Sequence, residues 1–426
     1  MKRLGLIMVF LFALSALWAG GGGQPQTAPP SGATTTTIRI MGYGGQDPAI
    51  VSRLLNEVIG ADLRSKNIEL VYEPLEGDYN AALFNALSAG TAADIFYIPV
   101  ETAPGIIATG RVLPLNGLLD ASPFISTLNE AFTVDGNLDG IAKDFNTLAL
   151  FYNKDIFDEA GVPYPTENET WDSLADKARR ISALGPEFYG LALPGGYDRF
   201  GAFAFAAGWQ PFGGPNGRTN LLDPNFISAV EWYTNLVKEG VGVLPSDIGQ
   251  GWGGGAFATE RVGMAFEGAW MIGFLRNEAP NLEYGSTFMP RHPRTGQRGN
   301  FLYTVAYGIN STSPHREAAL EVLKALTSDK AQQFILEEGL AIPSRTALSN
   351  NPYFNQPGIE PATNRVIFQG ASDGNVLGFQ FGRVGTDWMT PVNSILSEVM
   401  TGQSTLNAAL QRAQQDMDAL LNRAGM

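Results

Sequence analysis

Residues 93–100 read ADIFYIPV, an apolar run that is typical of a central parallel strand buried on both faces. Two strand–helix units come before it. The first is IRIMGY at 38–43 with a helical pattern over 48–66, and the second is IELVYEPL at 68–75 with a helix that stops at Gly90. This alternation predicts a parallel, right-handed open sheet and therefore an α/β fold.

The composition of the chain narrows its class. A length of 426 residues exceeds one ordinary hydrophobic core, so two domains are expected. The formal charge of −14 would repel a nucleic acid. The sequence contains no cysteine, which excludes disulfides, thiolate metal sites and cysteine nucleophiles. The two histidines, His292 and His315, each lie beside a proline, which disfavours a catalytic triad or a histidine metal site.

The N-terminus has the layout of a secretory signal peptide. Lys2 and Arg3 precede an uncharged apolar run at 4–19 that is short for a membrane span. We expect a signal peptide at 1–19, then a low-complexity linker at 20–37 that resembles a lipoprotein tether without its lipid-bearing cysteine. The chain is therefore expected in the periplasm or at the cell surface, either released or held by an uncleaved anchor.

Beyond residue 145 the sequence becomes largely helical, with a predicted N-cap at Thr170 and an amphipathic helix at 226–240. The stretch AFATERVGMAFEGAW at 256–270 predicts a short buried strand at 262–266, which delivers a carboxylate, a glycine and a tryptophan at its carboxyl end. Ligands bind at such strand ends in open α/β sheets. The alternative is a tryptophan that simply fills the core.

Several segments, taken in order, resemble the extracytoplasmic solute-binding proteins of ABC transporters, in the maltose-binding-protein-like, sugar-binding group. The matching segments are AGTAADI at 89–95, YNKDIF at 152–157, AGVP at 160–163, TWDS at 170–173, FATERVGMAFEGAW at 257–270 and YGI at 307–309. They are similar to the family patterns SGTxPDV, YNKxxFxxAGxPxPxTWxEL and FxxGxxAMxxxGxW. Ala93 replaces the family's proline and Ser173 an acidic residue. The resemblance covers about residues 38–422.

The resemblance implies two α/β lobes joined by hinge strands, with a ligand cleft between them. Each lobe would be discontinuous: the N-lobe at 38–145 and 307–341, and the C-lobe at 146–306 and 342–426. The chain would cross between lobes near 145–148, 303–306 and 341–344. It implies a monomer that captures a di- or oligosaccharide by hinge closure and delivers it to membrane permease subunits. No enzyme activity, cofactor, metal or nucleic acid is implied.

A sugar presents hydroxyl groups and flat, weakly apolar faces, so its site needs polar acceptors and aromatic planes. The resemblance implies that Glu101 accepts a hydrogen bond from one sugar hydroxyl, that Asn146 forms a hydrogen bond with another, and that Trp270 is a stacking platform for the sugar. Each has an alternative: a helix cap for Glu101, a hinge hydrogen bond for Asn146, and the core for Trp270. The remaining candidates lie beside strand ends or the last helix pair: Trp388, Asp387, Arg383, Tyr43, Glu76, Asp78, Tyr197, Asp198, Trp252, Glu267 and Gly268.

Two other functions stay open at this point. A secreted glycosidase would need two facing carboxylates, roughly 5 Å apart when retaining and roughly 6.5–9.5 Å apart when inverting. A binding protein for a sugar phosphate, a polyamine or a metal ion is the other alternative. A phosphate would require a basic cluster, for which Arg383 alone is thin support because it could equally pair with Asp387.

Overall fold

The computed structural model describes residues 34–45, 47–379 and 381–426, without the side chains of residues 382 and 383. The predicted signal peptide and most of the predicted linker lie outside these ranges. Residues 35–426 form one compact unit. Among the described residues, no helix is long and apolar enough to cross a membrane.

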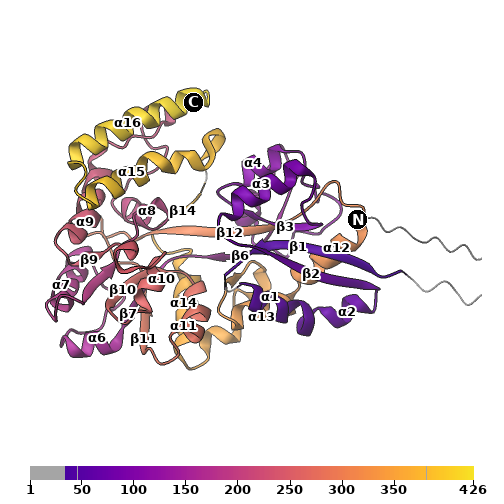
Figure 1. Ribbon diagram of the computed structural model, residues 1–426, viewed down its shortest axis with the longest axis horizontal. Helices are drawn as coiled ribbons and strands as arrows, with labels where there is room; N and C mark the ends of the chain where they lie inside the picture. Colours follow the sequence, from indigo (N-terminus) through magenta and orange to yellow (C-terminus); the bar gives the residue numbers. More distant parts are fainter. Residues whose placement is uncertain (1–33, 46, 380) are drawn as a thin grey trace, which may run out of the picture. The chain divides into compact units, whose positions relative to one another are not determined.

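Two β-sheets organise the described chain (Figure 1). The first contains, in spatial order, β13 (Ile342–Pro343), β6 (Ile141–Asn146), β12 (Gly299–Ile309), β3 (Ile95–Pro99), β1 (Thr36–Tyr43) and β2 (Ile68–Leu75), with β14 (Asn375–Gly378) paired to β12. Strands β1, β2 and β3 are parallel, as the sequence predicts. The sheet as a whole is mixed, because β12 lies antiparallel to both β3 and β6.

The second sheet is built from the middle of the chain. Its order is β11 (Tyr284–Thr287), β7 (Ala149–Asn153), β10 (Val262–Glu267), β8 (Tyr189–Ala192) and β9 (Gly242–Val243). Strand β10 is central, with all six residues buried, which explains its uninterrupted apolar sequence. It runs parallel to β8 and antiparallel to β7. A small separate hairpin joins β4 (Thr133–Val134) to β5 (Asn137–Leu138).

The chain passes between the two sheets at three places. It leaves the first sheet between β6 and β7, at residues 146–149. It returns along β12, which pairs with β14 at its start and with β3 and β6 further along (Figure 1). It leaves again after β13. The predicted lobe boundaries at 145/146 and 306/307 fall inside β6 and β12, and the one at 341/342 falls at the start of β13.

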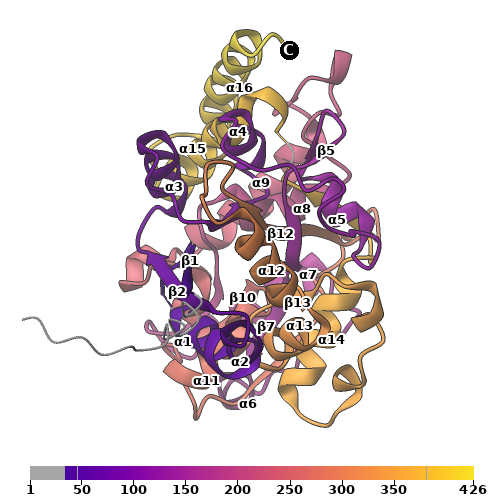
Figure 2. The same ribbon diagram turned by 90° about the vertical axis from the view of Figure 1, so that its right-hand side faces the viewer.

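Helices cover both sheets. Those that accompany the first sheet are α1 (Asp47–Arg53), α2 (Gly60–Arg64), α3 (Tyr79–Ala89), α4 (Ala103–Ala108), α5 (Ser126–Glu130), α12 (Arg316–Leu326) and α13 (Asp329–Glu337). Those of the second part are α6 (Lys154–Glu159), α7 (Trp171–Ser182), α8 (Tyr197–Ala206), α9 (Pro224–Lys238), α10 (Gly253–Phe257), α11 (Trp270–Glu278), α14 (Ile359–Gly370), α15 (Met389–Met400) and α16 (Leu406–Arg423). Figure 2 shows α15 beside α16, which it contacts.

Local sequence accounts for several helix ends. Thr170 caps α7 by accepting a hydrogen bond from the Ser173 amide, and Ser173 Oγ accepts in return from the Thr170 amide.

The prediction of one continuous helix over 48–66 is wrong in one respect. The segment forms α1, a π-helical turn at Leu54–Val58 and then α2. Gly60 allows this widened turn, because a Cβ there would lie 2.3 Å from the Leu55 carbonyl oxygen.

Helix α8 packs directly on the start of β12, and Gly299 makes this approach possible. A Cβ at Gly299 would lie 1.9 Å from the Ala202 carbonyl oxygen and 2.5 Å from the Ala206 nitrogen. Both are backbone atoms that cannot rotate away. The contact seats α8 against the strand that joins the two sheets.

We expect Gly299→Ala to lower the free energy of unfolding by about 1–3 kcal/mol, because the added methyl forces α8 away from β12. Urea denaturation measures the change. Gly378→Ala is the matched control, since this glycine on the paired strand β14 has open space around its Cβ position. Equal effects of the two substitutions would contradict the packing argument.

Candidate functional site

An inner chamber of about 290 Å³ is lined by strands of the first sheet and by Trp270 of α11, the helix that follows β10 of the second sheet. Its lining residues come from the end of β1, the start of α1, the turn after β3, β6, α11, β12 and the loop before β13. They are Tyr43, Asp47, Val100, Glu101, Lys143, Asp144, Asn146, Trp270, Tyr303, Thr304, Val305, Leu340 and Ala341. Four predicted site residues therefore meet here: Tyr43, Glu101, Asn146 and Trp270. The chamber lies where the chain passes between the sheets.

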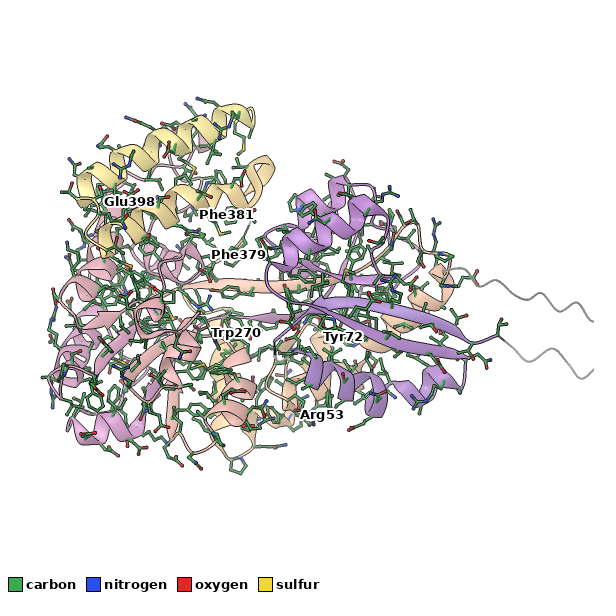
Figure 3. All side chains as sticks on the ribbon, viewed as in Figure 1. Arg53, Tyr72, Trp270, Phe379, Phe381 and Glu398 are labelled. Carbon is green, nitrogen blue, oxygen red and sulfur yellow. The ribbon has the colours of Figure 1, made fainter. Side chains whose placement is uncertain are left out.

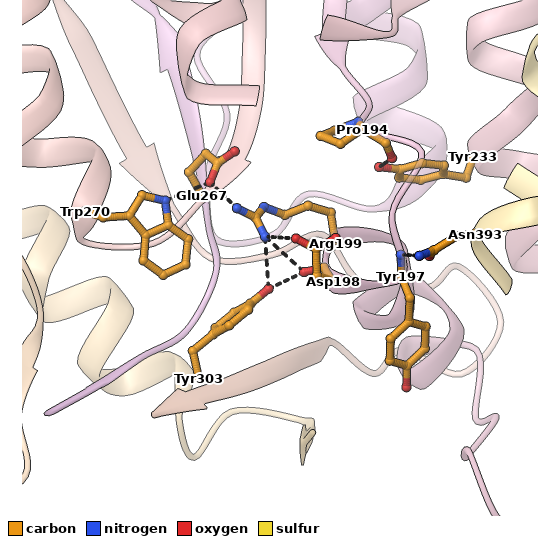
Figure 4. Close-up of polar contacts among 9 residues, drawn as sticks. All are labelled: Pro194, Tyr197, Asp198, Arg199, Tyr233, Glu267, Trp270, Tyr303 and Asn393. Carbon is orange, nitrogen blue, oxygen red and sulfur yellow. Dashed lines mark hydrogen bonds and ion pairs between the residues drawn. The ribbon is translucent and has the colours of Figure 1, made fainter. Parts of the chain in front are cut away.

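Trp270 is held in the chamber wall by a polar network (Figure 4). Its indole Nε1 donates to Glu267 Oε2 at 2.9 Å, and the Arg199 guanidinium donates to the same oxygen at 2.7 Å. Arg199 also lies over the Trp270 ring, with its Cζ 5.3 Å from the centroid. The Tyr303 ring meets the Trp270 ring edge-on, 5.3 Å between centroids. Trp270 lies near the strands that join the two sheets (Figure 3).

Glu267 acts on Trp270 rather than on a ligand. Its side chain is fully buried, so its predicted direct ligand contact is wrong for this structure. Burial raises the pKa of Glu267, and the positive charge of Arg199 opposes that rise. Gly268 is likewise buried, and a Cβ there would lie 2.4 Å from the Trp270 ring. The strand end predicted as a ligand site thus supplies Trp270 together with the residues that hold it.

The other chamber walls carry polar side chains. The Asn146 side-chain oxygen accepts from the Ala269 amide at 2.9 Å, which leaves its NH₂ group to donate toward a ligand. Burial raises the pKa of Glu101, and a hydrogen bond with Asn80 opposes the rise. Burial also raises the pKa of Asp47, from 3.8 to about 6. Asp47 was not predicted: its position before Pro48 at a helix start is the only sequence signal that could have indicated it.

Lys143 and Asp144 form an ion pair at the chamber floor, with side chains only 9% and 7% exposed. Burial alone would lower the pKa of Lys143, but Asp144, Tyr307 and Asp47 together outweigh it and raise the value. The ammonium group also lies 4.9 Å from the centroid of Tyr97. These residues were missed because a strand sequence does not show which of its charged residues face a cavity.

A second, outer chamber of about 680 Å³ adjoins the first. Its walls are Gly44, Gly45, Asp47, Ala49, Trp252, Trp270, Phe274, Asn277 and Glu278. Asp47 and Trp270 line both chambers, so the two are neighbours. The predicted site residue Trp252 belongs to this outer chamber.

Two predicted aromatic contacts are instead part of the core. Trp388 is 0% exposed, and its Nε1 donates to Thr219 Oγ1 at 2.8 Å. Its ring stacks on Phe381 and lies 5.0 Å from Tyr197, which is itself buried. The predictions that Trp388 and Tyr197 contact the ligand are therefore wrong for this structure. The apolar rings around Trp388 enclose it, and its one polar atom is already satisfied.

The remaining predicted residues lie outside the linings of the two chambers. Asp78 caps α3 through the Ala81 amide at 3.0 Å, and Glu76 is exposed beside Gly44 and Gly45. Asp198 pairs with Arg199 at 2.7 Å and is half exposed. Asp387 is exposed at the end of a 3-10 segment, and the side chain of Arg383 is outside the described residues.

Removing one member of the Arg199–Glu267 pair leaves a buried charge uncompensated. We expect Arg199→Met and Glu267→Met each to cost about 3–5 kcal/mol of unfolding free energy, whereas the double variant should cost less than their sum by about 1–3 kcal/mol. Urea denaturation of all three variants measures this coupling. The exposed pair Arg179–Glu239, 3.2 Å apart, is the control. The coupling energy between substitutions at these two residues should be less than about 1 kcal/mol. Additive effects at Arg199 and Glu267 would contradict the argument.

The raised pKa of Asp47 predicts a pH-dependent stability. Between about pH 4 and 6 the folded chain binds more protons at this residue than the unfolded chain, so Asp47 destabilises the fold increasingly as pH rises. We expect Asp47→Asn to be more stable than the wild type by up to about 3 kcal/mol at pH 7, and by almost nothing at pH 4. The exposed Asp416→Asn serves as control. A difference independent of pH would contradict the assignment.

Comparison with known proteins identifies the family. Similar sequences include a binding protein from Brucella abortus, 29% identical over 63% of this chain and 67% of the relative. A galactooligosaccharide-binding protein from Bacillus subtilis is 23% identical over 76% of each chain. An ABC substrate-binding protein from Listeria monocytogenes, solved with cycloalternan, superposes with a TM-score of 0.81, at 20% identity, 92% coverage of this chain and 100% of that one.

A solute-binding protein from Agrobacterium vitis, solved with D-mannitol, gives a TM-score of 0.73 at 21% identity, covering 92% and 99% of the two chains. These structural likenesses confirm the predicted two-lobed α/β fold. The family model described as bacterial extracellular solute-binding protein matches residues 51–333, which is more than half of the sequence. The chain therefore belongs to the family of bacterial extracellular solute-binding proteins.

Proposed function

We propose that this protein is the extracytoplasmic substrate-binding component of an ABC transporter and that its ligand is a carbohydrate. The observation that carries the proposal is the inner chamber. It brings Trp270 together with the carboxyl groups of Asp47 and Glu101 and the amide of Asn146. An aromatic plane flanked by hydroxyl partners matches the two surfaces that a sugar presents. The sugars named for several relatives support the same ligand class.

Capture by closure follows from the position of the chamber. Its walls combine strands of the first sheet with Trp270, which follows β10 of the second sheet. Among the described residues, the chain connects the sheets only through the crossing at 146–149, strand β12 and the segment after β13. A rotation at these connections would bring Trp270 and Tyr43 toward or away from each other. The N-lobe (38–145 and 307–341) and the C-lobe (146–306 and 342–426) would be the moving bodies. The closed monomer would then deliver its sugar to the permease outside the cytoplasmic membrane.

The charges of the chamber favour a neutral ligand over an anionic one. Lys143, the one lysine among the lining residues, is already paired with Asp144. Asp47 and Glu101 add negative charge. A sugar phosphate would meet carboxylates instead of the cations it needs. A neutral sugar, by contrast, can donate its hydroxyl hydrogens to these carboxyl groups.

The glycosidase alternative has one observation in its favour. A carboxyl group with a raised pKa, such as Asp47 or Glu101, is what a general acid requires. Burial is the largest cause of both shifts, however, and a binding site buries its carboxyl groups in the same way. The relatives are binding proteins, which favours capture without turnover.

We expect one sugar in a panel of mono-, di- and oligosaccharides to give saturable tryptophan fluorescence changes with the purified chain. At about a hundredfold over its dissociation constant, that sugar should add roughly 2.7 kcal/mol to the unfolding free energy. Trp270→Ala should abolish both signals, because the stacking plane is lost. Trp232→Phe, which alters a ring packed on Trp171 and Phe203, is the control that should retain binding.

Three results would count against the proposal. The absence of binding across the panel would move the assignment to a solute other than sugar. Release of shorter sugars during prolonged incubation, followed by chromatography, would show turnover and support the glycosidase. Binding that survives Trp270→Ala unchanged would place the site elsewhere.

A further inference from the structure

We propose that the sugar bound in the inner chamber carries a protonated amino group, which the carboxyl groups of Asp47 and Glu101 hold. This inference rests on the proposed function and narrows it, since it names a class of sugar within the carbohydrates. The observation behind it is an excess of negative charge among the side chains that line the chamber.

Asp47 is the clearest sign of this excess. It is 8% exposed and lines both chambers. Within the described part of the chain, its carboxyl group has no hydrogen-bond or ion-pair partner. Burial raises its pKa to about 6, and the attraction of Lys143 is opposed by the repulsion of Asp144. A carboxylate this deeply buried needs a counter-charge or several hydrogen-bond donors, and the described residues supply neither.

The basic side chains near the chamber are already neutralised. Lys143 is paired with Asp144. Arg199, in the network that holds the chamber's tryptophan, meets the carboxylates of Glu267 and Asp198, each at 2.7 Å (Figure 4). That network therefore has one more negative charge than positive charges. Neither basic group is left to compensate the two remaining carboxyl groups of the chamber.

The effect of these carboxyl groups extends to their neighbours. Burial is the largest cause of the raised pKa of Tyr43, and the charges of Glu101 and Asp47 raise it further. Burial likewise raises the pKa of Glu101; a hydrogen bond with Asn80 opposes that rise, and the charge of Asp198 adds to it. The electrostatic potential of the chamber is therefore negative, which repels an anion and attracts a cation.

An ammonium group compensates this charge better than a hydroxyl group does. A hydroxyl can donate one hydrogen to a carboxylate, but the negative charge stays uncompensated. A protonated amine donates three hydrogens and brings the opposite charge with them, and such charge-assisted hydrogen bonds are roughly twice as strong as neutral ones. The rings of Tyr43 and Tyr303 also line the chamber, and aromatic faces attract cations.

The lining suits an amino sugar better than other cations. Among the described residues, no group of three or more histidine, cysteine, aspartate and glutamate side chains is placed to hold a metal ion. A linear polyamine would satisfy the carboxylates but would leave the ring of Trp270 without a flat partner. An amino sugar offers both the positive charge and a flat, weakly apolar face.

The test compares sugars that differ only at one position. The probes are D-glucose, D-glucosamine and N-acetyl-D-glucosamine, the matching galactose series, and the β-1,4-linked dimers of the glucose series. The N-acetyl form keeps the nitrogen but has no charge. Calorimetry at pH 7 suits the comparison, because an amine with a pKa of about 7.7–8.0 is then largely protonated. We expect at least one amino sugar to bind about tenfold more tightly than both of its neutral analogues.

Two variants link the preference to the proposed carboxyl groups. Asp47→Asn and Glu101→Gln keep the size and hydrogen-bonding capacity of the side chains but remove their charge. Each should weaken binding of the amino sugar about tenfold more than binding of its neutral analogue. Asp416→Asn, at an exposed position, is the matched control and should keep the wild-type preference. Melting temperatures of all three variants establish that they are folded.

The outcomes separate this inference from the proposed function. Neutral sugars that bind as tightly as their amino analogues, or binding confined to neutral sugars of the larger panel, would overturn the amino-sugar assignment and leave carbohydrate binding intact. A preference that survives both charge-removing variants would overturn it as well. Spermidine bound more tightly than any amino sugar would show that charge alone is recognised. A wild type that binds no sugar, neutral or aminated, would overturn the proposed function and this inference with it.

Discussion

The buried ion pair between Arg199 and Glu267 is the constraint on which the rest of the site depends. A carboxylate with no exposed surface must be compensated, and Arg199 from α8 does so at 2.7 Å. The same carboxylate holds the Trp270 indole, and the same guanidinium lies 5.8 Å from the Tyr303 ring centroid (Figure 4). One pair thus ties together the end of β10, the first residue of α11 and strand β12. The Trp270 ring is thus held in place, which would lower the entropic cost of binding if a ligand stacks on it as proposed.

The charges of the inner chamber follow from a second constraint, which is the burial of its carboxyl groups. Asp47 is 8% exposed, so burial makes its ionised form costly and raises its pKa, although the nearby Lys143 opposes the rise. A sugar hydroxyl that donates to this carboxylate would stabilise the ionised form and offset part of that cost. Ligand binding and the ionisation of Asp47 are therefore linked in sign: each favours the other. Burial makes the ionised form of Asp47 unfavourable, and a neutral hydroxyl donor can reduce that desolvation cost.

Sequence reasoning predicted what depends on local pattern. Strands β1 to β3, central β10 and the Thr170 cap follow from periodicity and capping chemistry, and the ordered motifs indicated the two-lobed fold. It failed where the outcome depends on packing between distant segments. The π-helical turn at 54–58 rests on one close approach at Gly60. Tyr197 and Trp388 follow strand ends or loops as site residues do, but apolar rings from other parts of the chain enclose them. Nothing local to Asp47 distinguishes it from an exposed helix-start aspartate.

Trp388 and Trp252 show which physical feature separates a core tryptophan from a candidate platform. Both lie in irregular sequence just before a helix, and both make edge or stacked contacts with phenylalanine. Around Trp388 the neighbours are other large side chains, and they close over both faces until no surface remains exposed. Around Trp252 the neighbour beneath the ring is bare backbone at Gly254, which supports the ring without surrounding it. Trp252 stays partly exposed and lines the outer chamber, whereas Trp388 has no exposed surface left.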